Sequence, residues 1–117
     1  MAISAMIGCG KKYTTVSVEE FAKIITDTSV YLLDVRTQEE YLENHIPRAI
    51  NIDVNSENFT DSVAANVPKD SKIAVYCRSG RRSKIAAGKL SKAGYKDIID
   101  LDGGIVAWLE KSYPTTK

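Results

Sequence analysis

Apolar and polar positions follow two alternating periods along most of this chain. Short runs rich in β-branched and aromatic residues occur at 30–33, 49–52, 72–76 and 98–101, as expected of buried strands. Between these runs the apolar residues recur at the spacing of one helix face. Strands that alternate with amphipathic helices form parallel sheets covered by helices, so the pattern predicts an α/β fold.

Hydroxyl residues mark the starts of the first two predicted helices. Ser17 precedes Glu20 by three positions, and Thr37 precedes Glu40 by the same number. In this spacing the hydroxyl and the carboxylate each accept a hydrogen bond from a free backbone amide at the helix start. We therefore expect helices to begin at both places, the first running to about residue 25.

Apolar stripes predict three further helices. Phe59, Val63 and Val67 recur at spacing four, which indicates a helix that ends before Pro68. A helix starting near Ser83 and ending in a left-handed cap at Gly94 is expected next. Its predicted buried residues are Ile85, Ala86, Leu90 and Ala93. After the turn at 102–104, a last helix is expected to bury Ile105, Trp108 and Leu109.

The length of 117 residues suits one domain with its own core. We divide the chain into a flexible extension (1–11), a domain (12–113) and a C-terminal tail (114–117). Hydrophobic residues make up 44% and charged residues 26%, and the formal net charge is +1. This balance argues against nucleic acid or a membrane surface as the main partner.

The two cysteines, Cys9 and Cys77, are 68 positions apart, and the chain has one histidine. This is neither a disulfide framework nor a metal-ligand spacing, so we expect reduced thiols and a cytoplasmic protein. Residues 1–10 have no basic leading region and are too short to span a bilayer. Residues 6–9 nevertheless resemble the approach to the lipidated cysteine of bacterial lipoproteins, so export with an anchor at Cys9 is the alternative.

Cys77 is the strongest candidate for chemistry. It follows the predicted strand 72–76 and therefore lies at the carboxyl edge of the sheet, where open α/β folds bind their ligands. Inward-pointing loop amides and the positive end of the next helix would favour a thiolate there. The nearby cations are Arg78, Arg81, Arg82 and Lys84. The competing interpretation, a small buried residue beside a solvated basic face, explains this concentration of cations less well.

Several separate motifs resemble the rhodanese family, and the similarity covers most of the chain from Ser17 to Trp108. The motifs are 33–36 with 39–41, His45-Ile-Pro47 with 49–51, 75–80 with 82–83, and 103–105 with 107–108. The resemblance implies a rhodanese-like α/β fold, with a five-stranded, mostly parallel sheet and helices on both faces. It also implies a sulfurtransferase whose loop cysteine accepts sulfane sulfur from thiosulfate or another persulfide and passes it to a thiophilic acceptor.

On this resemblance Cys77 is the catalytic residue, and no metal or organic cofactor is needed. The substrate-binding residues are expected to be Arg78, Ser79, Gly80, Arg81, Arg82 and Ser83. Among them, we expect Arg78 and Arg81 to dock the sulfonate end of thiosulfate and Arg82 to anchor the loop. Asp34, Arg36 and His45 are expected to support the site, the first two as an ion pair and the third through hydrogen bonds.

The chain departs from the family pattern at two positions that usually hold glycine, Asn44 and Arg48. Asparagine tolerates a left-handed backbone better than other non-glycine residues, so we expect Asn44 to keep such a turn. We expect Arg48 to be a solvated surface charge.

Two other function classes remain open. A cysteine phosphatase or arsenate reductase also holds an oxyanion over a thiolate, but tyrosine-type phosphatases place five residues between cysteine and arginine, whereas four separate Cys77 from Arg82. Some rhodanese-like domains are binding modules that have lost the cysteine, which is present here. The expected partners are a small sulfur-containing anion as donor and a thiol, a thioredoxin-like protein or a sulfur-accepting protein as acceptor.

Overall fold

The computed structural model describes residues 12–117, so Cys9 and the predicted extension lie outside the described residues. The strands are β1 (Thr14–Val16), β2 (Tyr31–Asp34), β3 (Ile50–Asn51), β4 (Lys72–Tyr76) and β5 (Asp97–Leu101). The helices are α2 (Val18–Ile24), α3 (Gln38–Glu43), α4 (Phe59–Asn66), α5 (Arg81–Lys92) and α6 (Gly104–Glu110). Within this part of the chain, no helix has the length and apolar character needed to cross a bilayer.

The five strands form one parallel sheet in the order β1-β5-β4-β2-β3, which confirms the predicted α/β class. β4 is the central strand, with β5 on one side and β2 on the other. The register places Val75 opposite both Leu33 and Asp100, and Tyr76 opposite Asp34. The carboxyl ends of the three middle strands therefore meet at one edge, next to Cys77.

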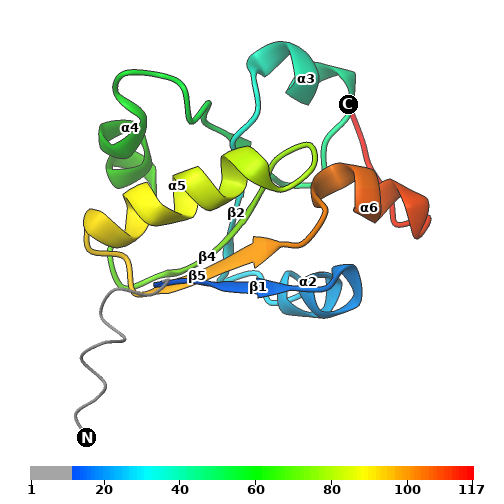
Figure 1. Cartoon of the computed structure of the whole chain (residues 1–117), viewed down its shortest axis with the longest axis horizontal. Coiled ribbons are helices and arrows are strands. Elements are labelled where there is room, and N and C mark those ends of the chain that lie inside the picture. The colour runs from blue at the N-terminus through cyan, green and yellow to red at the C-terminus, as the bar shows by residue number, and fades with distance from the viewer. Residues whose placement is uncertain (1–11) are drawn as a thin grey trace, which may run out of the picture.

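Helices cover both faces of this sheet (Figure 1). One core lies between the sheet and α4 and α5, and includes Phe59, Val63 and Leu90. The second lies under α2 and α6, where Phe21 meets Trp108 edge to face with ring centroids 6.2 Å apart. Because both faces are covered, the strands are apolar on both sides, as the continuous runs in the sequence indicate.

The local signals for helix starts and ends hold in the structure. The Ser17 hydroxyl accepts from the Glu20 amide, and Thr37 and Glu40 form a complete capping box. Gly94 follows α5 with a φ of +108°. α5 begins at Arg81, two residues before the predicted start, because Gly80 takes the left-handed N-cap position.

The buried stripes of α5 and α6 differ from the prediction at two residues. Ile85 and Leu109 were expected in the core, but they are 52% and 43% exposed. The residues that α5 buries are Ser83, Ala86, Ala87 and Leu90, at helical spacings of three and four. Ile85 and Leu109 each stand one position away from a buried residue, about 100° around the helix, and this turns them to solvent.

Of the two departures from glycine, Asn44 differs from expectation, and Arg48 makes contacts that the sequence did not predict. Asn44 has an extended backbone (φ −169°), so the predicted left-handed turn is absent there. Arg48 instead has a φ of +66°. Arg48 is exposed, as expected of a surface charge, and its guanidinium also donates to the carbonyls of Ile25, Asp27 and Val30 at the end of α2.

The segment after residue 113 lies against the domain. The Trp108 indole donates to the Pro114 carbonyl at 2.8 Å. His45 and Thr116 exchange two backbone hydrogen bonds of 2.8 Å in an antiparallel bridge. The last residues of the chain are therefore held beside α3, as Figure 1 shows.

Candidate active site

Cys77 lies in the turn between β4 and α5 and is 1% exposed. The Gly80 amide donates to the Cys77 Sγ at 3.1 Å, so the loop curls around the sulfur. The first amides of a helix have no carbonyl partner within it, and they carry the positive end of the helix dipole. The start of α5 after Gly80 therefore favours negative charge on or near this sulfur.

The amino end of α6 fixes the back of the same loop. The Ile105 amide donates to the Cys77 carbonyl at 2.9 Å, and the Val106 amide donates to the Arg78 carbonyl at 3.1 Å. Both carbonyls consequently point toward α6. Gly104 permits this approach, because a Cβ at that position would lie 2.3 Å from the Arg78 carbonyl oxygen.

A buried polar group lies on the other side of the sulfur. The Ser83 hydroxyl is 3.6 Å from the Cys77 Sγ and 2.5 Å from Oδ1 of Asp100, whose side chain is fully buried. Lys84 and Thr15 bind the other carboxylate oxygen at 3.0 and 2.9 Å. Asp100 is a site residue that the sequence analysis missed. The available signal was one carboxylate inside an otherwise apolar strand.

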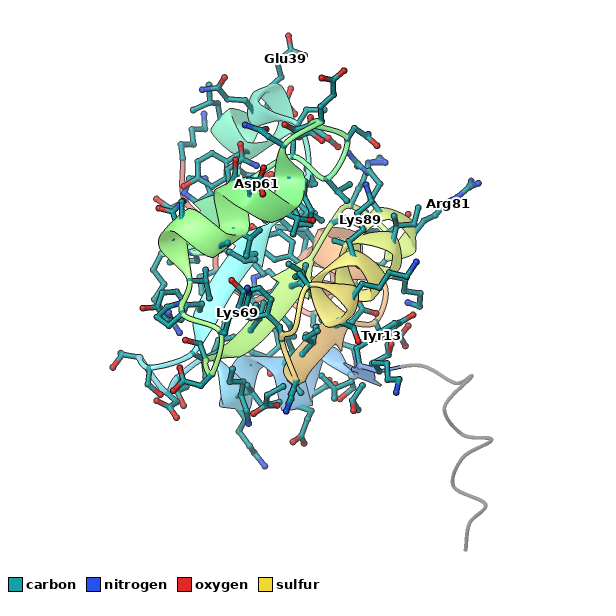
Figure 2. The ribbon with its side chains drawn as sticks, turned by 90° about the vertical axis from the view of Figure 1, so that its left-hand side faces the viewer. Tyr13, Glu39, Asp61, Lys69, Arg81 and Lys89 are labelled. Carbon is teal, nitrogen blue, oxygen red and sulfur yellow. The ribbon has the colours of Figure 1, made fainter. Side chains whose placement is uncertain are left out.

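Two of the four cations expected around Cys77 have carboxylate partners of their own. Arg82 forms a two-pronged ion pair with Glu40, at 2.7 and 2.9 Å, and Lys84 pairs with Asp100. Arg78 and Arg81 are exposed, and Arg81 extends away from the domain (Figure 2). The positive charge free to meet an incoming anion is therefore smaller than the sequence indicates.

Glu40 joins α3 to the start of α5, and this pair predicts a pH effect. The Arg82 hydrogen bonds, helped by Thr37, lower the pKa of Glu40 to about 2. In an unfolded chain a glutamate has a pKa of about 4.3. The pair therefore stabilises the fold above that pH and loses its contribution as the pH falls toward 2. Replacing Glu40→Gln should reduce the free energy of unfolding by about 1 kcal/mol at pH 7, since the pair is partly exposed. Urea unfolding from pH 7 to pH 3 measures this.

The difference between Glu40→Gln and the native protein should shrink across that range. Glu39→Gln is the matched control, because Glu39 projects into solvent on the same helix (Figure 2). A pH-independent loss in Glu40→Gln would contradict the assignment.

Asp34 and Arg36 form a buried ion pair that is hydrogen-bonded to Tyr76, the residue before Cys77. Arg36 binds Asp34 at 2.7 Å and also donates to the Asn44 carbonyl at 2.6 Å. The Tyr76 hydroxyl donates to Asp34 at 2.6 Å and accepts from the Ile46 amide. Burial and the charge of Asp34 raise the pKa of Tyr76, so its hydroxyl stays neutral. The network ties the base of the loop to the segment that follows α3.

The His45 ring makes its contacts with Tyr41 and not with Cys77. Its ring stacks on Tyr41 with centroids 3.7 Å apart, and its Nδ1 lies 2.9 Å from the Tyr41 carbonyl. The hydrogen bonds of the Cys77 sulfur go to Gly80 and Ser83. In the structure His45 therefore supports α3 and the C-terminal segment.

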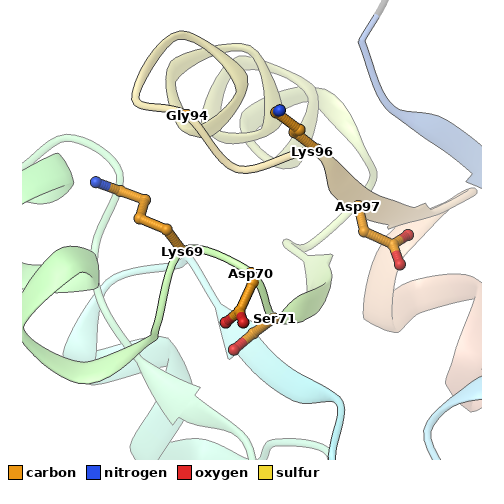
Figure 3. Close-up of a pocket in the computed structure, with 6 residues that line it drawn as sticks. All are labelled: Lys69, Asp70, Ser71, Gly94, Lys96 and Asp97. Carbon is orange, nitrogen blue, oxygen red and sulfur yellow. The ribbon is translucent and has the colours of Figure 1, made fainter.

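One hollow of the surface is remote from Cys77. It measures about 420 Å³ and lies near the amino ends of β4 and β5 (Figure 3). Its lining residues are Lys69, Asp70, Ser71, Gly94, Lys96 and Asp97. Among residues 12–117, no three metal-ligating side chains gather at one place. The candidate active site is thus the small loop around the Cys77 sulfur.

Comparison with known proteins agrees with this geometry. The model of the rhodanese-like domain matches residues 17–111. A sulfurtransferase of Allochromatium vinosum is 34% identical over 97 residues, which cover 82% of this chain and 88% of that protein. The adenylyltransferase and sulfurtransferase uba4 of Ogataea parapolymorpha is 35% identical over 115 residues, covering 92% of this chain but 28% of the larger protein.

The fold is also similar to solved structures. The crystal structure of a rhodanese-related protein from Thermoplasma volcanium matches with a TM-score of 0.72 and 30% identity. The match covers 89% of this chain and 98% of that one. The similarity therefore extends over most of the fold.

Proposed function

The chain belongs to the rhodanese family, and on that premise we propose that it is a sulfurtransferase that carries sulfane sulfur as a persulfide on Cys77. The family and its sulfurtransferase relatives support sulfur transfer in general. The observation that carries the finer proposal is the position of the Cys77 sulfur, which accepts from the Gly80 amide at the start of α5.

The first half-reaction loads the cysteine. The Cys77 thiolate attacks the outer sulfur of thiosulfate, a sulfur–sulfur bond forms, and the bond to the sulfonate breaks with release of sulfite. We expect the exposed guanidiniums of Arg78 and Arg81 to attract the dianion as it approaches, whereas Arg82 holds the loop through Glu40. The product is a Cys77 persulfide whose terminal sulfur carries the negative charge.

The loop stabilises this terminal charge through its backbone. Amides of Arg78 through Ser83 lie in the turn and the first helical turn after Cys77, where preorganised donors stabilise an anion without moving. In the second half-reaction a thiolate or another thiophilic nucleophile attacks the terminal sulfur and leaves Cys77 as a thiolate. We propose a small thiol, a thioredoxin-like protein or a sulfur-accepting protein as that acceptor, in the cytoplasm where thiols stay reduced.

Intact mass after incubation with thiosulfate tests the proposal. We expect a gain of one sulfur atom in the native protein, removed by dithiothreitol, and no gain in Cys77→Ser. Cys9→Ser is the matched control and should load like the native protein. Absence of the gain together with hydrolysis of an aryl phosphate would assign the loop to phosphatase chemistry. Absence of both would indicate a binding module.

A further inference from the structure

The Ser83 hydroxyl has one proton and lies within reach of two oxygen acceptors and of the Cys77 sulfur. Asp100 Oδ1 is at 2.5 Å, the Gly80 carbonyl at 3.3 Å and the Cys77 sulfur at 3.6 Å. A short hydrogen bond to a carboxylate is about twice as strong as one between neutral groups. The proton of Ser83 therefore goes to Asp100, and the hydroxyl oxygen turns its lone pairs toward the sulfur.

The orientation of Asp100 is set by donors on its other side. Lys84 Nζ and Thr15 Oγ1 both bind Oδ2, at 3.0 and 2.9 Å. Burial works against the Lys84 charge, but the hydrogen bond and the charge of Asp100 outweigh it and raise the Lys84 pKa. Lys84 thus stays a donor, and Oδ1 remains the oxygen that faces Ser83.

We infer that Asp100, acting through Ser83, is a positioning residue that disfavours a free negative charge on the Cys77 sulfur. A neutral Cys77 thiol can donate its proton to the Ser83 oxygen, which then donates to Asp100. A Cys77 thiolate in the same arrangement faces the lone pairs of Ser83, with a buried carboxylate behind them.

This arrangement distinguishes the free thiolate from the persulfide, a step that rests on the proposed function. In a persulfide the Cys77 Sγ is uncharged, and the negative charge lies on the terminal sulfur, toward the loop amides. The Ser83 lone pairs then face a neutral atom. Asp100 consequently favours the resting thiol and the loaded persulfide over the reactive thiolate, and it makes Cys77 a poorer leaving group when an acceptor attacks the persulfide.

The other charged groups near this pair come from several elements. Arg82 and Lys84 project from α5, Asp102 follows β5, and Tyr13 precedes β1. Arg82 acts on Cys77 by charge but is paired with Glu40, and Asp102 and Tyr13 act on Lys84. Ser83 is the group that touches both the sulfur and Asp100.

The test is the pH dependence of Cys77 alkylation by iodoacetamide in the reduced protein without sulfur donor, followed on the Cys77 peptide by mass spectrometry. In Asp100→Asn, the amide oxygen must face Lys84 and Thr15, so its NH₂ group donates to Ser83. The Ser83 proton is thereby free to turn to the sulfur. We expect the midpoint of alkylation to move to lower pH by about one unit.

The sign of the shift in Ser83→Ala separates this inference from the simpler idea that Ser83 donates to the thiolate. Our inference requires a lower midpoint, because the thiol loses its acceptor, whereas the simpler idea requires a higher one. Adding Asp100→Asn to Ser83→Ala should give a smaller shift than in the native background. Asp102→Asn is the matched control and should leave the midpoint unchanged.

Three results would overturn the inference: an unchanged or higher midpoint in Asp100→Asn, a higher midpoint in Ser83→Ala, or an equal Asp100→Asn shift with and without Ser83. Should Asp100→Asn fail to fold by circular dichroism, Ser83→Ala still decides the sign. Alkylation needs no sulfur transfer, so its outcome is independent of the thiosulfate loading experiment.

Discussion

Replacing Gly104→Ala is expected to cost about 3 kcal/mol or more in the free energy of unfolding and to disorder the Cys77 loop. The new Cβ would lie 2.3 Å from the Arg78 oxygen and 2.6 Å from the Cys77 oxygen, both backbone atoms that cannot rotate away. The residue also has a φ of +62°, which strains alanine. Urea denaturation measures the loss of unfolding free energy. Thiosulfate loading of the variant shows whether the Cys77 loop keeps its active arrangement.

Gly88→Ala is the matched control, because it places the same methyl group on a helical glycine with nothing within 4 Å. Alanine is the better helix former, so this variant should gain about 0.5–1 kcal/mol in stability and load sulfur normally. If Gly104→Ala were as stable as the native protein and loaded equally fast, the amino end of α6 would not set the loop geometry.

The second large effect is expected from Arg36→Met. This change leaves the carboxylate of Asp34, which is fully buried, without its cation, and loss of one partner of a buried pair typically costs about 3–5 kcal/mol. The free energy of unfolding from urea titration at pH 7 gives the magnitude. The Asn44 carbonyl loses its donor as well, so the chain between α3 and β3 should loosen.

Lys111→Met provides the comparison, because Lys111 and Glu19 form an ion pair of 3.0 Å in which both side chains are 57% exposed. Solvent already satisfies these groups, and no measurable change is expected. A loss in Arg36→Met no larger than that in Lys111→Met would show that Asp34 is adequately satisfied by Tyr76 and the Arg36 amide alone.

Local sequence signals predicted much of the fold because they act over three or four residues. Ser17 and Thr37 stand at helix starts, Phe59 and Val63 lie on one buried face, and the run 72–76 is the central strand. The position of Cys77 at the end of that strand follows from the same reasoning. Each of these features depends on backbone geometry that neighbouring residues determine together.

What the sequence did not predict depends on partners distant in the chain. Arg82 meets Glu40 across 42 positions, and Ser83 meets Asp100 across 17. The chain alone shows four cations near one cysteine, but it does not show which of them a carboxylate neutralises. Ile85 was misplaced for a similar reason, since the face that α5 buries is set by the sheet beneath it.

The central position of β4 in the sheet should protect the Cys77 loop from local opening. Strands bonded on both sides release their amide hydrogens to solvent by opening of the whole molecule, whereas short edge elements exchange through local opening. Cys77 directly follows β4, while the two-residue strand β3 occupies an edge. We therefore expect that β3 can fray while the cysteine remains attached to β4, where exchange should be slowest.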